Sequence, residues 1–332
     1  MTAQDRAALV ALVAKWHRYA SEYHDLGGAA YRSCALDLHS SQPRSSARMS
    51  EQRLSFMEFE SPWFFNPGTV RLPSPPDGLS TDEVRRRLMT GQLAQPYILE
   101  TSSHRCLYFT QSNVQSVMSL DEPDALITAY TRKMMAFLLF NPAPKRITMV
   151  GLGGGSLAKF CHRNLQQAQI TVVEIDPRVV ALREEFRIPA DDARFRVVCA
   201  DGAHYISQRT EPIDVLLVDA FDPIGVAPTL AASDFYAQAA QRLSPRGVMV
   251  MNFSGVPNRY VTHIERIGVA FGGSTLLVPV IADDNLLLFA FRRRIPLPTT
   301  AKYQSRAQRL QSRLTLEFPL YLRRICQGHV LS

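Results

Sequence analysis

The middle of the chain, about residues 145 to 295, is predicted to form a doubly wound α/β domain with a largely parallel sheet of seven strands. The first observation is that seven short apolar segments alternate there with segments of helix length. Continuous apolar strands separated by helices are typical of parallel sheets that helices cover on both faces. The second observation is a glycine turn, Gly151-Leu152-Gly153-Gly154-Gly155, directly after the first apolar segment. Such sheets bind ligands at the carboxyl ends of their strands, so we expect the site at that edge.

The residues before this domain are predicted to form an accessory region over 1–100. Apolar spacing over 4–24 predicts an amphipathic helix, and Ser80 with Glu83 predicts a capping box at the start of a second helix. Residues 61–78 carry five prolines and are expected to be an extended connection. The aromatic residues of the first helix, with Trp63-Phe64-Phe65, are interpreted either as a lid over the site or as a plain hydrophobic flank.

Two further regions flank the central domain. Residues 101–144 are predicted to contain a β-hairpin, with strands over 106–110 and 114–120, followed by a helix over 124–140. Residues 299–332 are predicted to form one basic amphipathic helix. We expect this helix to pack on the domain or on a neighbouring subunit rather than on a membrane.

The composition is that of a globular protein and argues against several function classes. The chain has 332 residues, of which 46% are hydrophobic, and a net charge of +7. Because the basic residues are scattered without interleaved aromatic residues, we expect no nucleic acid partner. The N-terminus lacks the pattern of a signal peptide and no apolar run reaches about 18 residues, so a cytoplasmic protein without a membrane partner is expected. The five cysteines are isolated, which predicts neither a zinc site nor disulfides.

Polar residues follow the first four strands of the predicted sheet. The glycine turn after the first strand lets the backbone approach a ligand closely. Glu174 ends the second strand, where an acid can accept both hydroxyls of a ribose, and Asp201 ends the third, where it can accept from an adenine amino group. Asp219 and Asp222 follow the fourth strand. We therefore predict a nucleoside site at this edge.

Strand-end acids have a second common role, which is to cap the following helix. Each of Glu174, Asp201 and Asp222 is open to that interpretation. Asp176 is expected to do only this, because Pro177 follows it at the first helical position.

The segment from about Cys106 to Phe291 resembles the spermidine synthase family, a branch of the class I methyltransferase fold with its Rossmann-like sheet. The resemblance rests on the hairpin and on the motifs VGLGGGSL, VVEIDP, ADGAHYI and DVLLVDAFDPIG, in that family's order. It implies that the cosubstrate is an adenosyl sulfonium, either S-adenosylmethionine or its decarboxylated form, with no metal. Contacts to this cosubstrate are then expected from Gln115, Gly151, Gly153, Gly154, Gly155, Glu174, Ile175, Asp201, Gly202 and Asp219.

The resemblance also implies a reaction and its residues. Asp219 and Asp222 would be catalytic, orienting and deprotonating an amine that attacks the carbon next to the sulfonium and releases methylthioadenosine. A small amine or amino acid would be the substrate, and a homodimer or homotetramer is expected. Substrate contacts are expected, on weaker grounds, from Tyr130, Arg132, Tyr236 and Asn252.

The chain departs from the family at two positions that affect the choice of donor. Gly154 stands where the family has an Asp that binds the donor's ammonium, and the family's Tyr-Gln pair aligns with Thr131-Arg132, beside Tyr130. A cation at Arg132 could hold an α-carboxylate, which favours S-adenosylmethionine itself as the donor. The other interpretation is that Arg132 is a surface arginine.

Several functions remain open on these grounds. The group transferred to the nucleophile could be an aminopropyl, an aminocarboxypropyl, which could also cyclise, or a methyl. A plain methyltransferase and a non-catalytic nucleoside-binding or oligomeric module on the same fold are the alternatives. A nicotinamide dehydrogenase is disfavoured, because it leaves the acids after the third and fourth strands without a role.

Overall fold

The computed structural model describes residues 54–64, 67–110, 113–222, 225–226, 229–230, 233–254, 260–294, 300–327 and 329–331. The helix expected over 4–24 lies outside these residues, as does most of the lid suggested from its aromatic side chains. The described chain divides into two compact units, one up to Pro123 and one from Asp124 onward.

The first unit is a five-stranded antiparallel sheet in the order of the chain. Its hairpin of β4 and β5 confirms the predicted one, and β2 lies inside the stretch expected to be a plain connection. Because β3 pairs with β4, the expected boundary at residue 100 falls inside this sheet, and the unit extends to Pro123. Its elements are β1 (Phe56–Glu60), β2 (Thr69–Pro73), α2 (Thr81–Met89), β3 (Tyr97–Glu100), β4 (His104–Thr110) and β5 (Asn113–Ser119).

Side chains of this unit explain its packing. Ser80 caps α2 by accepting the amide of Glu83 at 3.3 Å, as its sequence position predicted. Trp63 stacks on Tyr97, and Tyr97 stacks on Tyr108, with ring centroids 5.9 and 5.4 Å apart. Trp63 is therefore part of the packing of its own unit.

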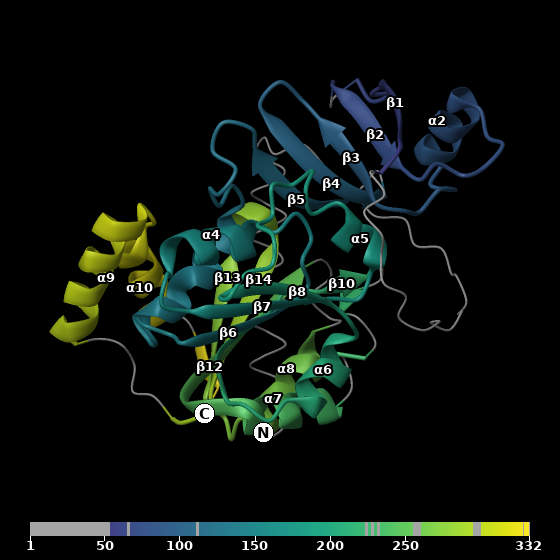
Figure 1. Ribbon diagram of the computed structural model, residues 1–332. Helices are drawn as coiled ribbons and strands as arrows, with labels where there is room; N and C mark the ends of the chain where they lie inside the picture. Colours follow the sequence, from purple (N-terminus) through teal and green to yellow (C-terminus); the bar gives the residue numbers. More distant parts are fainter. Residues whose placement is uncertain are drawn as a thin grey trace. The chain divides into compact units, whose positions relative to one another are not determined.

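The second unit contains the predicted doubly wound sheet (Figure 1). Its strand order is β15-β13-β14-β12-β9-β6-β7-β8, in which β12, β9, β6, β7 and β8 are parallel. The seven predicted strands are confirmed, and the short β15 adds an eighth beside β13. The strands are β6 (Arg146–Val150), β7 (Gln169–Glu174), β8 (Phe195–Cys199), β9 (Ile213–Val218), β12 (Leu243–Ser254), β13 (Thr275–Val280), β14 (Asn285–Phe291) and β15 (His329–Leu331). A separate two-stranded pair consists of β10 (Phe221–Asp222) and β11 (Gly225–Val226).

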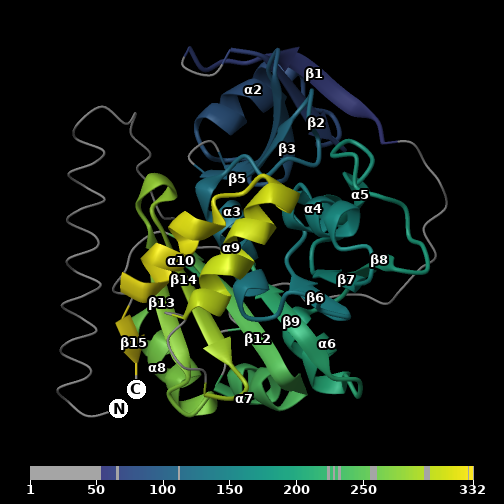
Figure 2. The same ribbon diagram turned by 90° about the vertical axis from the view of Figure 1, so that its left-hand side faces the viewer.

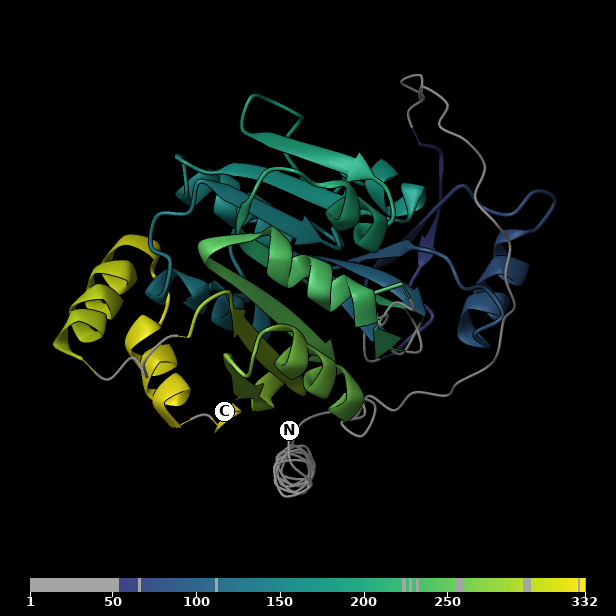
Figure 3. The same ribbon diagram turned by 90° about the horizontal axis from the view of Figure 1, so that it is seen from below.

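Helices cover both faces of this sheet (Figures 2 and 3). On one face lie α6 (Gly202–Gln208), α7 (Ser233–Arg242) and α8 (Val261–Ala270), which share one buried apolar cluster with β9, β12 and β14. On the other face lie α3 (Ala129–Met134), the 3-10 helix η1 (Met135–Leu139), α4 (Ser156–Asn164) and α5 (Pro177–Ala181). Burial on both faces explains why these strands are apolar along their whole length.

Two helix predictions needed correction. The helix expected over 124–140 begins only at Ala129 and becomes 3-10 from Met135. The single helix expected near the C-terminus is a pair, α9 (Ala301–Leu314) and α10 (Phe318–Gln327), because Thr315 adopts a left-handed φ of 56° between them. Both pack against η1. Among the helices that the structure describes, none is long and apolar enough to cross a membrane.

Candidate functional site

The glycine turn joins β6 to α4 and needs its glycines. Gly151, Gly153 and Gly155 all have positive φ values, of 97°, 51° and 69°. A Cβ on Gly151 would lie 2.1 Å from the carbonyl oxygen of Asp219, and one on Gly155 would lie 2.5 Å from the side chain of Ile188. The turn therefore lies against the end of β9, with its backbone close to that strand. Gly154, which is buried, has no such positive φ.

Glu174 ends β7 and binds the glycine turn. Its carboxylate accepts the amide of Leu152 at 2.8 Å and the amide of Asp176 at 2.9 Å. Burial raises the pKa of this carboxyl, while the two amides oppose that shift. Each oxygen keeps a further lone pair, so the carboxylate can still accept from a ribose. Next to it, Ile175 exposes 61% of its surface and offers an apolar contact at the same edge.

Asp201 and Asp176 both cap helices. Asp201 accepts the amide of His204 at 2.8 Å at the start of α6, and Asp176 accepts the amide of Arg178 at 2.9 Å at the start of α5. The cap at Asp176 confirms its expected role. Asp201 lies at the end of β8, beside the end of β7, so its cap leaves the second carboxylate oxygen to contact a ligand at this edge. Gly202 is a packing position, because a Cβ there would lie 2.4 Å from Val150.

Asp219 follows β9 and is held by two hydrogen-bond donors. The phenol of Tyr130 donates to its Oδ2 at 3.1 Å, and Nδ2 of Asn252 donates to its Oδ1 at 2.9 Å. Burial raises the pKa of Asp219, and these two donors partly offset the rise. Burial and the charge of Asp219 raise the pKa of Tyr130 well above its usual value, so Tyr130 remains a donor at neutral pH. Tyr130 and Asn252 thus lie beside Asp219, and their contact with a substrate stays a prediction.

Two residues that the sequence did not indicate complete this cluster. Asp283 accepts the backbone amide of Tyr130 at 2.6 Å, and Asn285 donates to Oδ1 of Asn252 at 2.9 Å. Asp283 lies in the turn between β13 and β14, and Asn285 is the first residue of β14. A signal for them exists in the sequence, because the polar run Asp283-Asp284-Asn285 interrupts two apolar strands. Asn285 pairs with Ser254 at the end of β12, so the turn reaches the same edge of the sheet as Asp219.

Two suggested substrate contacts lie elsewhere. Arg132 donates from one guanidinium nitrogen to the carbonyl oxygens of Leu126 and Ile127, so it binds the residues that precede its own helix. Tyr236 is fully buried, and its hydroxyl is 2.9 Å from Nδ1 of His263 on α8. Its ring belongs to the apolar core that α7 and α8 share, and its hydroxyl has a hydrogen-bond partner there, as a buried Tyr usually does.

The remaining predicted residues are placed only in part. Asp222 lies in β10, opposite Gly225, and the structure describes its backbone alone. Gln115 lies half-buried on β5 in the other compact unit, so its contact with a nucleoside stays a prediction.

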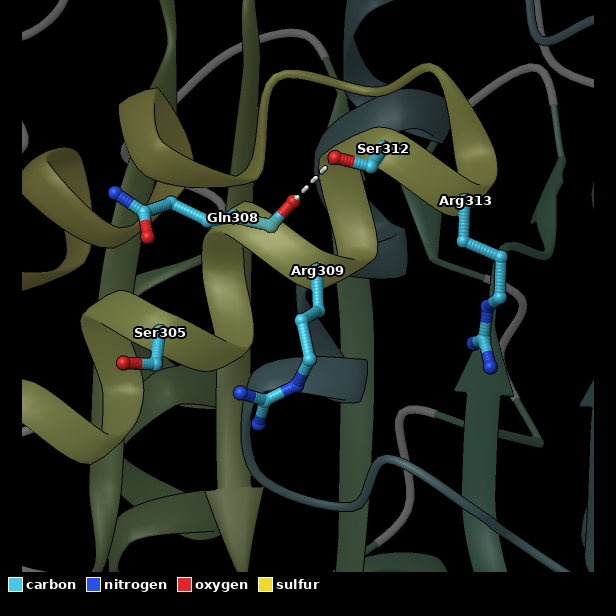
Figure 4. Close-up of a pocket in the computed structure, with 5 residues that line it drawn as sticks. All are labelled: Ser305, Gln308, Arg309, Ser312 and Arg313. Atoms are coloured by element: carbon cyan, nitrogen blue, oxygen red, sulfur yellow. Dashed lines mark hydrogen bonds between the residues drawn. The ribbon is translucent and has the colours of Figure 1, made fainter.

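A shallow depression of the surface lies away from these residues (Figure 4). It follows one face of α9, and the side chains that line it all come from that helix, namely Ser305, Gln308, Arg309, Ser312 and Arg313. Since no strand end contributes to it, we do not assign it to the nucleoside. Within the described residues, no three His, Cys, Asp or Glu side chains are grouped as metal ligands would be.

Comparisons with known proteins identify related sequences and a related fold. Residues 127–265 match the family model of the spermine/spermidine synthase domain. A polyamine aminopropyltransferase of Chromobacterium violaceum is 36% identical over 256 residues, which cover 74% of this chain and 98% of that protein. One of Neisseria meningitidis is 35% identical over 223 residues, covering 67% and 85%. A solved spermidine synthase in complex with the transition-state analogue AdoDATO aligns with a TM-score of 0.55 at 16% identity, covering 85% of this chain and 94% of that one, which shows a shared fold.

Proposed function

This chain belongs to the family of the polyamine aminopropyltransferases, and from that membership we propose that it transfers an aminopropyl group from an adenosyl sulfonium to an amine. The donor in this proposal is decarboxylated S-adenosylmethionine. The nitrogen of the amine attacks the methylene carbon bonded to sulfur, and the carbon–sulfur bond breaks with its electron pair passing to sulfur. The products are methylthioadenosine and an amine that is longer by one aminopropyl group.

The observation that carries the proposal is the carboxylate of Asp219, held beside the glycine turn. Its two oxygens accept from Tyr130 and Asn252, and each keeps a lone pair for an ammonium group. The raised pKa makes this carboxylate a stronger base than an exposed Asp, which suits it to take the proton that the amine loses. Most of the rate would come from holding amine and sulfonium together, because the sulfonium is already a good leaving group.

The position of Arg132 supports the decarboxylated donor. The guanidinium that could have held an α-carboxylate instead binds the carbonyls of Leu126 and Ile127. Glu174 would hold the ribose, and Ile175 and Asp201 would contact the adenine. Asp222 follows Asp219 by three residues and would assist it at the amine.

The test is incubation with each sulfonium in turn and a diamine such as putrescine, followed by mass analysis of the nucleoside and amine products. We expect methylthioadenosine and an amine heavier by one aminopropyl group from the decarboxylated donor. Adenosylhomocysteine from S-adenosylmethionine would point to methyl transfer. Binding of both sulfonium compounds without any turnover in a screen of amines would favour a non-catalytic module and refute the proposal.

A further inference from the structure

Both donors to Asp219 are held by the same turn of the chain. Tyr130 comes from α3 and Asn252 comes from β12, so they approach Asp219 from different elements. The turn between β13 and β14, together with the first residue of β14, binds each of them. Asp283 accepts the amide of Tyr130, and Asn285 donates to Asn252.

Asn285 determines which end of the Asn252 amide faces Asp219. A carboxamide has one donor end and one acceptor end, and the network assigns which is which. Because Nδ2 of Asn285 donates to Oδ1 of Asn252, the Nδ2 end of Asn252 must face Asp219. Asn252 and Asn285 are only 2% and 4% exposed, so water has little access to replace either bond.

Asp283 fixes the start of the helix that carries Tyr130. The first amides of a helix lack partners within the helix, and Thr128 at the cap position makes no side-chain bond to them. Its hydroxyl is bonded to Thr131 instead. The Asp283 carboxylate takes the amide of Tyr130 in its place, at 2.6 Å. The position of the phenol therefore depends on the β13–β14 turn.

We propose that Asp283 and Asn285 are positioning residues for the base Asp219, acting through Tyr130 and Asn252. This inference rests on the proposed function, since it assigns a role in that reaction. Among the side chains that the structure describes, the groups that face Asp219 are Tyr130 from α3 and Asn252 from β12. Asp283 lies one bond further away, with Lys133 of α3 as its charged neighbour.

Asn285→Asp is the sharpest test, because it keeps the shape and changes a donor into an acceptor. The new carboxylate accepts from Nδ2 of Asn252, which turns Oδ1 of Asn252 toward Asp219 and sets two acceptors against each other. Asp219 then holds its proton more tightly, so the acidic limb of the kcat/KM profile moves to higher pH. We expect kcat at neutral pH to fall by about 10- to 100-fold, since a hydrogen bond to a charged group is lost. The KM for the sulfonium should stay unchanged.

Asn285→Ala separates this role from simple packing. If Asn285 only fills space, the smaller alanine lowers the kcat of folded enzyme at least as much as Asp does, because the cost of the buried carboxylate falls on stability. If it orients Asn252, Asn285→Asp is the more harmful change, because alanine leaves Asn252 able to face Asp219 with Nδ2. The opposite order of kcat would overturn the inference.

Asp283 has a matched control in the next residue. Asp283→Ala removes the acceptor of the Tyr130 amide and is expected to lower kcat, whereas Asp283→Asn keeps an acceptor oxygen and should recover most of it. Asp284→Gly removes an equal charge from the same turn, and glycine tolerates the φ of 54° at that position. It should leave kcat unchanged. Equal losses in Asp283→Ala and Asp284→Gly would argue against a role of Asp283 in positioning.

A measurement without turnover distinguishes failure of this inference from failure of the proposed function. The protein is labelled with ¹³C at its Asp carboxyls and followed by NMR. The signal of Asp219 is identified as the one that is missing from the spectrum of Asp219→Asn. It should titrate at higher pH in Asn285→Asp than in the native protein, whatever group the enzyme transfers. An unchanged titration refutes the positioning role, whereas native protein without turnover refutes only the proposed reaction.

Discussion

Replacing Gly151 with alanine would test whether the glycine turn and Asp219 depend on each other. A Cβ on Gly151 lies 2.1 Å from the carbonyl oxygen of Asp219, whereas ordinary van der Waals contact begins at 3.4 Å. The two strand ends must separate by about 1.3 Å, the difference between these distances. The φ of 97° adds backbone strain of about 1–3 kcal/mol in any residue with a side chain.

The separation should affect rate more than folding. A misplacement of about 1 Å between reacting groups can cost ~10²-fold in rate, so we expect kcat/KM for methylthioadenosine formation to fall by about that factor. The strain should lower Tm by roughly 3–10 °C. Affinity for methylthioadenosine, measured by calorimetry, should fall less than the rate, because Glu174 still accepts the amide of Leu152.

Gly272→Ala is the matched control. Gly272 also has a positive φ, of 59°, but a Cβ there meets nothing within 4 Å. It should lower Tm through strain and leave kcat/KM unchanged. A kcat/KM of folded Gly151→Ala within about threefold of that of Gly272→Ala would show that the close contact between the glycine turn and Asp219 does not contribute to the rate.

Three other predictions follow from the described side chains. Because burial raises the pKa of Asp219, its charged form destabilises the folded state, and this effect is lost as pH falls through the folded pKa. In urea unfolding, Asp219→Asn should therefore be more stable than the native protein at neutral pH, and the difference in stability should shrink as pH falls. The kcat of Asp219→Asn should fall by about 10²–10⁴-fold. Cys199 is exposed beside Glu174 and Cys161 is buried, so a thiol reagent should modify Cys199 before Cys161, and methylthioadenosine should slow the reaction at Cys199, as followed by peptide mass analysis. Equal rates with and without the nucleoside would place the ligand elsewhere. Ser80→Ala removes the cap of α2 and should lower the free energy of unfolding by ~1 kcal/mol in chemical denaturation, with Ser103→Ala as a control in the same unit.

Much of the fold follows from sequence pattern because the strands of the second unit are apolar along their length. The segments around Met149, Val172 and Leu217 carry that signal, and their order gives the parallel sheet. The helix over 124–140 was predicted to begin too early, because Ala125 and Leu126 extend the apolar spacing of the helix beyond its actual start at Ala129. Arg132 binds the carbonyls of Leu126 and Ile127, which keeps that stretch out of the helix.

The candidate site was predictable where a residue follows its strand directly. Glu174 and Asp219 lie at the ends of β7 and β9, as their positions in the sequence indicated. The network around Asp219 was harder to predict, because packing between elements far apart in the chain forms it. Tyr130 and Asn252 bind Asp219 directly, and Asn285 binds Asn252. Tyr236 was misplaced because sequence distance from the edge does not tell which face of α7 a residue occupies, and the hydroxyl binds His263 instead.

Helices α9 and α10 have a consequence for how the protein is made. They pack on η1, the segment that directly continues the helix of Tyr130, and Arg306 of α9 donates to the carbonyl of Leu139 in η1. A ribosome adding ~5–20 residues per second needs on the order of a few seconds to pass from β14 to the end of α10. During that interval the strand that carries Glu174 has been synthesised, but α9 and α10 do not yet cover η1, which continues the helix of Tyr130. A message truncated there would yield a chain that keeps the strand carrying Glu174 but lacks the two helices that pack on η1.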